Sequence, residues 1–247
     1  MRIYFASDLH LGASALNNNR ERELFFIKWL DCVKKDADQI FLMGDVFDFW
    51  FEYKHAVPKG FVRFLGKIAE ISDSGIPIHL FTGNHDFWIF DYLSKECGVI
   101  IHRDTETLIL NGKKFFLGHG DGLGAADRSY KLLRKIFNNR FIQKCFSWIH
   151  PDLGIGFARK WSSHSRLKNG NIEADDFRGE DGEHLIIFSK EILNKEHFDF
   201  FIFGHRHIPS DIKISENSRY INLGDWISHF TYAVFDGEDI ELKVFEK

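Results

Sequence analysis

Five short apolar runs in this chain are each followed by side chains that bind metal ions. The runs have the length and the aliphatic and aromatic content of buried β-strands, and they cover residues 3–6, 40–43, 78–81, 115–117 and 200–203. The segments after them are Asp8-Leu9-His10, Gly44-Asp45, Gly83-Asn84-His85-Asp86, Gly118-His119-Gly120-Asp121 and Gly204-His205-Arg206-His207. A strand end holds a side chain rigidly, and the loop after it can turn towards a shared centre. The sequence therefore predicts strands whose loops converge on one site.

The chemistry of these side chains predicts the kind of ion. Carboxylate, imidazole and amide oxygen together suit a hard or borderline divalent metal such as Mn²⁺, Fe²⁺ or Zn²⁺. Each segment alone is a weak or moderate signal, because a turn or chance explains it about as well. Five such segments in one order, each after an apolar run, are typical of a two-metal hydrolase. In such an enzyme two cations about 4 Å apart activate water and bind the oxygens of a phosphate.

The ordered segments resemble the motifs of calcineurin-like metallophosphoesterases. The resemblance implies two ligand sets that share Asp45: Asp8, His10, Asp45 and His207 for one metal, and Asp45, Asn84, His119 and His205 for the other. His85 would face the reacting phosphoryl group, where it stabilises charge or helps the leaving group depart. The alternative is that His85 only orients Asn84 or Asp121. Asn84 and His85 are the candidate catalytic residues.

Length and composition favour one compact domain. The chain has 247 residues, and its hydrophobic content of 44% is ample for a core. Cys32, Cys97 and Cys145 are scattered, which favours a reducing compartment over a disulfide framework. The N-terminus shows no signal-peptide pattern, and no stretch is long and apolar enough to span a bilayer. We therefore expect a cytoplasmic protein.

The order of elements predicts the fold class. Strand-like runs alternate with helical segments near residues 20–36, 59–74, 90–96 and 183–195. The tail has four strand-like segments, 211–215, 219–223, 229–235 and 240–245, which suggest a β-meander with a turn at Asp236-Gly237. We expect an α/β (α+β) fold, a four-layer αββα sandwich of two mixed sheets.

One segment interrupts this alternation and differs from the rest in charge. Residues 125–170 contain ten Lys or Arg and two Asp, a net charge of +8, whereas the whole chain carries −4 and the remainder therefore −12. Apolar residues recur through the segment at helical spacing: Tyr130, Leu133, Phe137, Phe141, Cys145, Trp148 and Ile149. We expect a helical cap, both basic and apolar, inserted at about residues 122–170 of a single domain that covers 1–247.

Three explanations of this cap stay open. Basic and apolar side chains on one helix suit an anionic lipid or the surface of an anionic membrane. An ordinary amphipathic cap, whose apolar stripe packs on the core, fits the pattern equally well. A nucleic acid is less favoured, because the insert is short and apolar and no known nucleic-acid module accompanies it. We expect no nucleic-acid partner.

The chain resembles one branch of these enzymes more closely, the UDP-2,3-diacylglucosamine diphosphatase family of lipid A biosynthesis. The similarity lies in residues 7–12, 44–48, 119–123 and 222–226, with Asp127 and the basic cap, so it spans nearly the full length. It implies hydrolysis of UDP-2,3-diacylglucosamine to UMP and 2,3-diacylglucosamine 1-phosphate (lipid X), with attack at the UMP-side phosphorus. It also implies two metals, usually Mn²⁺, with Fe²⁺, Zn²⁺ or Mg²⁺ compatible, and a peripheral position at the cytoplasmic face of an anionic membrane.

Candidate substrate contacts follow from the same resemblance. Phe137, Phe141 and Trp148 would contact the acyl chains. The sugar and phosphates would meet Asn84, His85, Asp127, Ser165, Arg166, Lys168 and His205. One position departs from the pattern, because His85 stands where well-known members of that family have Arg and generic metallophosphoesterases have His. Imidazole can act as an acid, whereas guanidinium binds two phosphate oxygens but cannot.

This departure keeps two alternatives open. The first is a phosphodiesterase or phosphatase of the same fold that acts on another substrate. The second is a scaffold that has kept the fold but lost catalysis. Retention of all seven ligand positions and of His85 argues against the scaffold.

Overall fold

Two mixed sheets form the centre of the protein. The computed structural model describes residues 1–13, 16, 18–124, 128–158, 160 and 177–246. One sheet has the order β11-β10-β1-β2-β3-β4, with bounds Ile240–Val244, Thr231–Phe235, Ile3–Ala6, Gln39–Leu42, Ile78–Phe81 and Ile100–His102. The other has the order β5-β6-β7-β9-β8, with bounds Glu106–Leu110, Lys113–Leu117, Phe200–Phe203, Ser218–Asn222 and Ser210–Ser215. Both sheets combine parallel and antiparallel pairs.

Aromatic side chains fill the space between the sheets. The ring of Phe5 stacks on Phe41 at 5.1 Å in the same sheet and on Phe115 at 6.2 Å in the other. Phe5 and Phe41 are also register partners in the parallel pair of β1 and β2. All four residues of β1 are buried, as expected for a central parallel strand that is covered on both faces. Stacked phenylalanine rings from both sheets therefore join the two sheets across this central layer.

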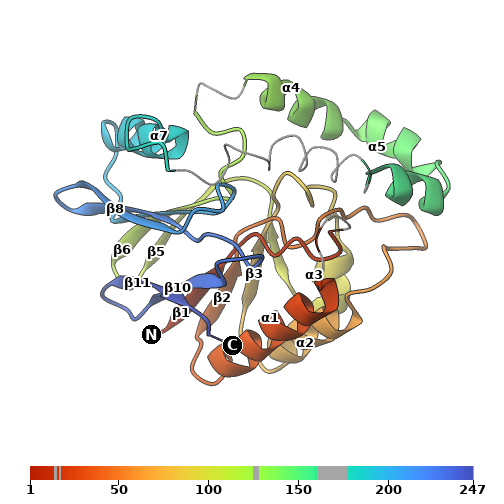
Figure 1. Ribbon diagram of the computed structural model, residues 1–247, viewed down its shortest axis with the longest axis horizontal. Coiled ribbons are helices and arrows are strands. Elements are labelled where there is room, and N and C mark those ends of the chain that lie inside the picture. Colours follow the sequence, from red (N-terminus) through yellow and green to blue (C-terminus); the bar gives the residue numbers. More distant parts are fainter. Residues whose placement is uncertain (14–15, 17, 125–127, 159, 161–176, 247) are drawn as a thin grey trace.

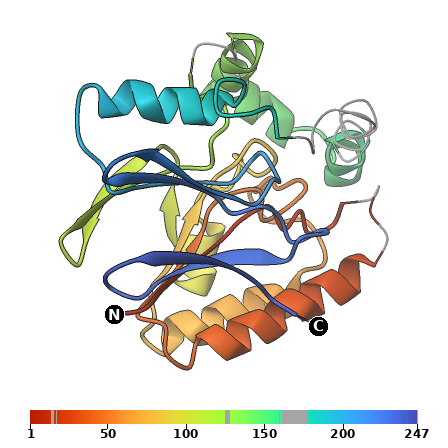
Figure 2. The ribbon, with the colours of Figure 1, turned by 60° about the vertical axis from the view of Figure 1, so that its left-hand side comes forward.

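Helices cover the outer faces of both sheets (Figures 1 and 2). Helices α1 (Asn19–Val33), α2 (Val62–Asp73) and α3 (Tyr92–Cys97) share one apolar cluster with the outer face of the first sheet. Helix α7 (His184–Leu193) packs through Leu185 and Ile186 on the outer face of the second. The layers are thus helix, sheet, sheet, helix, which confirms the predicted αββα sandwich.

The chain tail does not form the meander expected from its sequence. Strands β8 and β9 pair in the second sheet, whereas β10 and β11 pair in the first. The connection 223–230 carries the chain from one sheet to the other, with Gly224 at φ +71° and with no room for a Cβ beside Thr231 and Pro209. The alternating pattern of a strand does not reveal its neighbour, so the sequence indicated four strands but not their partners. Strands β4 and β5 were also not expected.

The described part of the predicted cap is mainly helical and lies over the loop ends of the strands. Helices α4 (Arg128–Phe137), α5 (Arg140–Ser147) and a helical segment at 151–158 lie between β6 and α7 in the chain, and Figure 1 shows α4 and α5 above the sheets. The break between α4 and α5 falls at Asn139, whose side chain accepts the N–H groups of Phe141 and Ile142. Within the described residues, no helix combines the length and apolar character needed to cross a membrane.

Candidate dinuclear metal site

Loops from both sheets meet at one edge of the sandwich. The loop after β1 is joined to the loop after β2 by backbone hydrogen bonds from Asp8 N to Gly44 O (3.1 Å) and from His10 N to Asp45 O (2.9 Å). In the second sheet, Gly204 N donates to His119 O over 3.0 Å. The N–H of His205 donates to Oδ2 of Asp8 over 2.9 Å and links the two sheets. The predicted convergence of the loops is confirmed.

The backbone of this site is strained. Nine non-glycine residues in the described part of the chain have positive φ, and five of them are predicted metal ligands: Asp8, His10, Asp45, His205 and His207. Their φ values lie between 45° and 67°, in the left-handed region that side chains disfavour. Such conformations cost about 1–3 kcal/mol each and concentrate at functional sites, where the surrounding structure enforces them.

Two glycines permit the close approach of these loops. A Cβ atom on Gly83 would collide with the carboxylate and backbone of Asp45. A Cβ atom on Gly204 would collide with Ser7 and Asp8. Glycine is therefore required at both positions by space rather than by φ, because neither residue has a positive φ.

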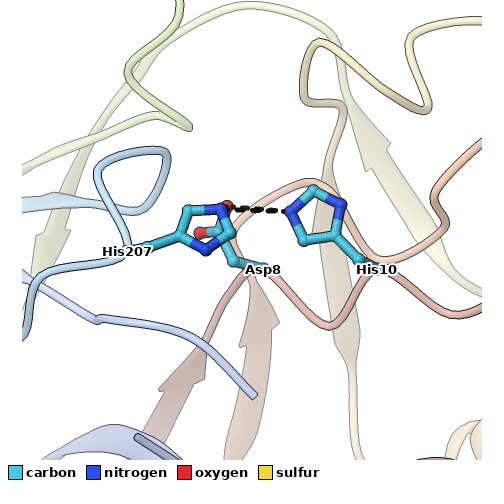
Figure 3. A group of neighbouring side chains, drawn as sticks. All are labelled: Asp8, His10 and His207. Atoms are coloured by element: carbon cyan, nitrogen blue, oxygen red, sulfur yellow. Dashed lines mark hydrogen bonds and ion pairs between the residues drawn. The ribbon is translucent and has the colours of Figure 1, made fainter. Parts of the chain in front are cut away.

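One group of donor atoms lies around His10. Figure 3 shows Asp8, His10 and His207 turned towards one another, and their ligand atoms all lie within 4.8 Å of one another. Nε2 of His207 is 3.1 Å from Oδ1 of Asp8 and 3.1 Å from Nε2 of His10. Two imidazole nitrogens and a carboxylate oxygen at this spacing form a concave set of donors for one cation.

A second group is built around Asp45. Oδ2 of Asp45 lies 3.4 Å from Nε2 of His119 and 3.7 Å from Nε2 of His10. This oxygen therefore stands between the two donor groups, where a shared ligand is expected. The other oxygen, Oδ1, accepts the N–H of His85 over 2.8 Å, which fixes the carboxylate plane. The ring of His205 lies 5.2 Å from that of His119.

Three buried donor atoms test whether metal ions fit here. Among the described residues, Oδ1 of Asp8, Oδ1 of Asn84 and Nε2 of His119 make no hydrogen bond. Leaving a buried polar atom unsatisfied costs about 1–3 kcal/mol, so such atoms are uncommon in folded proteins. Nδ1 of His119 lies 2.9 Å from Met43 O, which accepts the Nδ1 proton and leaves Nε2 facing the carboxylate of Asp45 at 3.4 Å. Divalent cations would satisfy all three atoms, so the residues fit the group.

Electrostatics keep the carboxylates ionised. Burial alone would raise the pKa of the Asp45 carboxyl, but His119 and His85 together hold it well below its usual value. The pKa of Asp8 is also held low, because His207 and His10 outweigh the effect of burial. Ionised carboxylates are the form that binds a cation.

The two histidines of the Gly204–His207 turn differ in protonation. Burial and the nearby His119 lower the pKa of His205 to about 4, so this ring is neutral at pH 7. Burial also opposes charge on His207, but Asp8 and Asp225 outweigh it and raise the pKa of His207 to about 10. A cation bound by His207 would therefore displace a proton.

The comparisons with known proteins agree with this geometry. The family model of calcineurin-like phosphoesterases matches residues 1–209. The chain belongs to the calcineurin-like phosphoesterase family. It is 41% identical to the UDP-2,3-diacylglucosamine hydrolase of Porphyromonas gingivalis, with 99% of this chain and 98% of that protein covered. It is 26% identical to the protein of the same name from Shewanella pealeana, with coverages of 98% and 97%.

A solved structure is also similar to this phosphoesterase. The structure of Yfce, a phosphoesterase from E. coli, has a TM-score of 0.47 and 14% sequence identity, with 99% of this chain and 93% of that chain covered. The family membership makes the chain a metal-dependent phosphoesterase with a dinuclear site of His and Asp residues, as the sequence predicted. The assignment of individual ligands stays a prediction.

His85 of this phosphoesterase lies beside the donor groups. Its ring meets the ring of His10 edge-on at 4.8 Å, and its side chain is 20% exposed, so one edge is open to a ligand. Nδ1 of His85 is 3.0 Å from the carbonyl of Asp48, which accepts a proton there and directs Nε2 away. The carboxylate of Asp48 lies 3.7 Å from the same nitrogen. Asp48 is thus a partner that orients His85.

Asp86 supports the two loops on either side of it. Its carboxylate is fully buried and accepts the N–H groups of Val46 and Gly83 over 2.7 and 2.8 Å. Burial, together with the nearby charge of Asp45, raises the pKa of Asp86 to about 7. Through these contacts Asp86 ties the loop after β2 to the loop after β3.

Sequence reasoning missed two buried charged residues. Arg22 lies on the apolar face of α1 and donates to Leu9 O (2.8 Å) and to His10 O (3.3 Å), so it holds the first metal loop from behind. Glu183 binds Arg206 through two hydrogen bonds, of 2.8 and 3.0 Å. A polar residue on the apolar stripe of a helix was the signal available for Arg22. Glu183 left no local signal.

The predicted cap contacts have different outcomes. Phe137 is half-buried, stacks on Phe87 at 5.2 Å, and receives a hydrogen bond at its carbonyl from Nε1 of Trp88 (2.9 Å). It therefore anchors the cap to the loop after β3. Phe141 is 73% exposed and Trp148 is 77% exposed. The remaining predicted contacts lie outside the described residues: Asp127, Ser165, Arg166 and Lys168.

Proposed function

We propose that this phosphoesterase hydrolyses the pyrophosphate bond of UDP-2,3-diacylglucosamine to UMP and 2,3-diacylglucosamine 1-phosphate, a step of lipid A biosynthesis. The observation that carries the proposal is the 41% identity to the Porphyromonas gingivalis hydrolase over 99% of this chain. That match includes the basic and apolar cap, which is a substrate-facing feature rather than part of the metal site. We propose that the cap, at about residues 122–170, and the sandwich act as one domain.

Two divalent cations would occupy the donor groups, and we propose that they are Mn²⁺. Asp8, His10, Asp45 and His207 would hold one, and Asp45, Asn84, His119 and His205 the other. The mixture of carboxylate, imidazole and amide donors suits Mn²⁺, and Fe²⁺, Zn²⁺ and Mg²⁺ are compatible alternatives. When bound, the pair supplies charge that activates water and stabilises the phosphate oxygens in the transition state.

The side chains around the metals would position the substrate. The carbonyl of Asp48 fixes Nδ1 of His85 and so directs Nε2 away from it. In its imidazolium form, His85 would donate the Nε2 proton to a phosphoryl oxygen or to the leaving group. The amide of Asn84 would contact the phosphate as well as a metal. We propose attack at the UMP-side phosphorus, because that route gives UMP as product.

The cap offers apolar surface for the acyl chains. Phe141, Trp148, Leu153 and Phe157 are each more than 60% exposed, and Arg140 and Lys144 lie on the same helical segments. Burial of such rings against acyl chains would contribute about 1.5–3 kcal/mol each. The same combination of exposed aromatic and basic side chains supports peripheral binding to the cytoplasmic face of an anionic membrane.

The direct test of the reaction is release of UMP in the presence of Mn²⁺. We expect rapid hydrolysis of UDP-2,3-diacylglucosamine and slow hydrolysis of UDP-N-acetylglucosamine, which lacks the acyl chains. Equal rates would exclude a role of the cap in acyl recognition. In isotopically labelled water, the label should enter UMP; label in the lipid phosphate would contradict attack at the UMP-side phosphorus.

A second test separates the cap from the metal site. The substitution Phe141→Asp changes an exposed ring, so the fold should be retained, while KM for the lipid should rise at least about tenfold through lost apolar burial. Turnover of a soluble aryl phosphodiester by the same variant should be unchanged. Sedimentation with anionic vesicles should be strong at low salt and weak at high salt; no binding at low salt would exclude membrane association.

One observation favours a broader phosphodiesterase as the alternative function. His85 has the imidazole of generic metallophosphoesterases at a position where a guanidinium would bind the lipid phosphate in two contacts. Hydrolysis of soluble phosphodiesters at rates above that of the diacylated nucleotide sugar would support this alternative.

A further inference from the structure

Asp225 lies behind the metal site, in the connection that crosses from β9 to β10. The residue is 3% exposed. Its Oδ1 accepts three backbone N–H groups, from Ile227 (2.9 Å), Ser228 (2.8 Å) and His229 (3.1 Å). One carboxylate oxygen therefore holds the turn together. The other oxygen, Oδ2, lies 3.4 Å from Nδ1 of His207.

The neighbouring residue fixes this turn in space. The ring of Trp226 is 2% exposed and packs at 4.6 Å from Phe26 and 5.3 Å from Trp29, both on α1. Its backbone N–H donates to the carbonyl of Asp8 over 3.1 Å. The position of Asp225 is thus set by the core and by the first metal loop, independently of His207.

His207 stands between Asp225 and the donor atoms of the first metal group. Its Nε2 faces Asp8 and His10, both at 3.1 Å, while its Nδ1 faces Asp225. A neutral imidazole has one N–H and one lone pair, and the nitrogen that binds a metal must carry the lone pair. The proton must then be on Nδ1, where a carboxylate is the matching acceptor.

We propose that Asp225 is a positioning residue for the metal site: its Oδ2 accepts the Nδ1 proton of His207 and so selects the tautomer whose Nε2 binds the metal. The backbone of His207 has φ +57°, a conformation that persists only where the surrounding structure enforces it. The inference rests on the dinuclear site of the proposed function, but it is independent of which phosphoester is hydrolysed.

The chain offers a near-isosteric variant and a matched control. Asp225→Asn keeps an oxygen for the three turn N–H groups and places an NH₂ group opposite Nδ1 of His207. That NH₂ favours the wrong tautomer, with the proton on Nε2. His229→Ala removes a ring that lies 3.1 Å from Oδ2 on the exposed side, and it leaves His207 and the hydroxyl of Ser228 in place.

The experiment measures binding of Mn²⁺ to the metal-free full-length protein, by the electron paramagnetic resonance signal of the free ion. We expect Asp225→Asn to lower the binding affinity for one of the two Mn²⁺ ions by about 10- to 100-fold. His229→Ala should change the binding affinity for neither ion by more than about twofold. In a His207→Gln background, Asp225→Asn should have no additional effect, because Asp225 acts through His207.

Three results would overturn the proposal: unchanged binding of both ions by Asp225→Asn, equal weakening by His229→Ala, or a full additional effect in the His207→Gln background. If Asp225→Asn does not fold, the wild-type protein loaded with Zn²⁺ still tests which nitrogen of His207 carries the proton. Long-range proton–nitrogen spectra should show the His207 proton on Nδ1, and a proton on Nε2 would reject the assignment. Failure to hydrolyse the lipid substrate would leave all these readouts intact, so the proposed reaction and the role of Asp225 can fail separately.

Discussion

Oδ2 of Asp45 lies 3.4 Å from Nε2 of His119, although the two residues follow strands of different sheets, β2 and β6. The distance across the dinuclear site is therefore set by the packing of one sheet on the other. Rings such as Phe5 and Phe115, which meet at 6.2 Å between the sheets, fix that packing. The metal site depends on the whole sandwich rather than on one loop.

Replacement of Asp45 should weaken the binding of both metal ions and remove the hydrolytic activity. Because its carboxylate lies between the two donor groups, Asp45→Ala should lower turnover of a chromogenic phosphodiester with Mn²⁺ by at least about 1000-fold. The metal content of the purified protein should fall for both ions. Asp211→Ala, which removes a surface ion pair with Arg219, is the matched control and should retain activity. Full activity of Asp45→Ala would refute the assignment of the site.

Replacement of His85 should depend on the leaving group. If Nε2 donates a proton, His85→Ala should lower kcat by about 100- to 10,000-fold for aryl phosphodiesters with a poorly acidic phenol. The loss should be small for nitrophenyl esters, whose leaving group needs no proton. His55→Ala, an exposed histidine in a loop, is the control. A uniform loss across the series would instead indicate a role in binding or in charge stabilisation.

Metal binding should become tighter as pH rises. Asp8 and Asp225 raise the pKa of His207 to about 10 in the metal-free protein, so a bound cation displaces a proton from it. The apparent affinity for Mn²⁺ should therefore rise about tenfold per pH unit between pH 6.5 and 8.5 for each proton released. A binding titration at several pH values measures this slope, which gives the number of protons released. In His207→Gln that number should be smaller by about one.

The stability of the metal-free protein should change in the opposite direction. The raised pKa of His207 contributes stability that is fully present below its unfolded-state value of 6.5 and is lost as pH rises through about 10. In the presence of a chelator, Tm should fall between pH 7 and 10, and His207→Gln should reduce that fall. A Tm that rises over this range in the wild-type protein would contradict the protonated state of His207.

The buried pair of Glu183 and Arg206 should stabilise the fold and the last metal loop. The side chain of Glu183 is 4% exposed and that of Arg206 is 14% exposed, so Glu183→Ala leaves a largely buried cation without its carboxylate. The free energy of unfolding should fall by about 3 kcal/mol in denaturant titrations. The matched control is Glu180→Ala, which breaks an exposed pair with Lys190 and should cost less than about 1 kcal/mol. Equal costs for the two variants would show that the buried pair has no special role.

Several features of the protein could be predicted because they are local. The apolar runs gave the central strands, and the helices were expected within a few residues of α1, α2, α3 and α7. Side chains with metal-binding chemistry were visible after the strand ends, and the resemblance to the family implied which seven of them are ligands. The helical character of the cap was also visible, since its apolar residues recur at helical spacing.

Other features depend on contacts between distant parts of the chain. The tail separates into two hairpins in different sheets, and no strand pattern shows which neighbour a strand will pair with. Asp225 supports His207 only because the crossing from β9 to β10 brings it there. Arg22 reaches the carbonyl of His10 only because α1 packs against the first loop.

The amino-acid order alone thus determined which residues have metal-binding chemistry and which segments are strands, because both are properties of short stretches. Tertiary structure alone decided how those residues meet: the left-handed backbone at five predicted ligands, the position of Asp45 between the two donor groups, and the buried carboxylates that hold the loops from behind. The physical reason is that strained loops and buried charges are stable only when two packed sheets supply their partners.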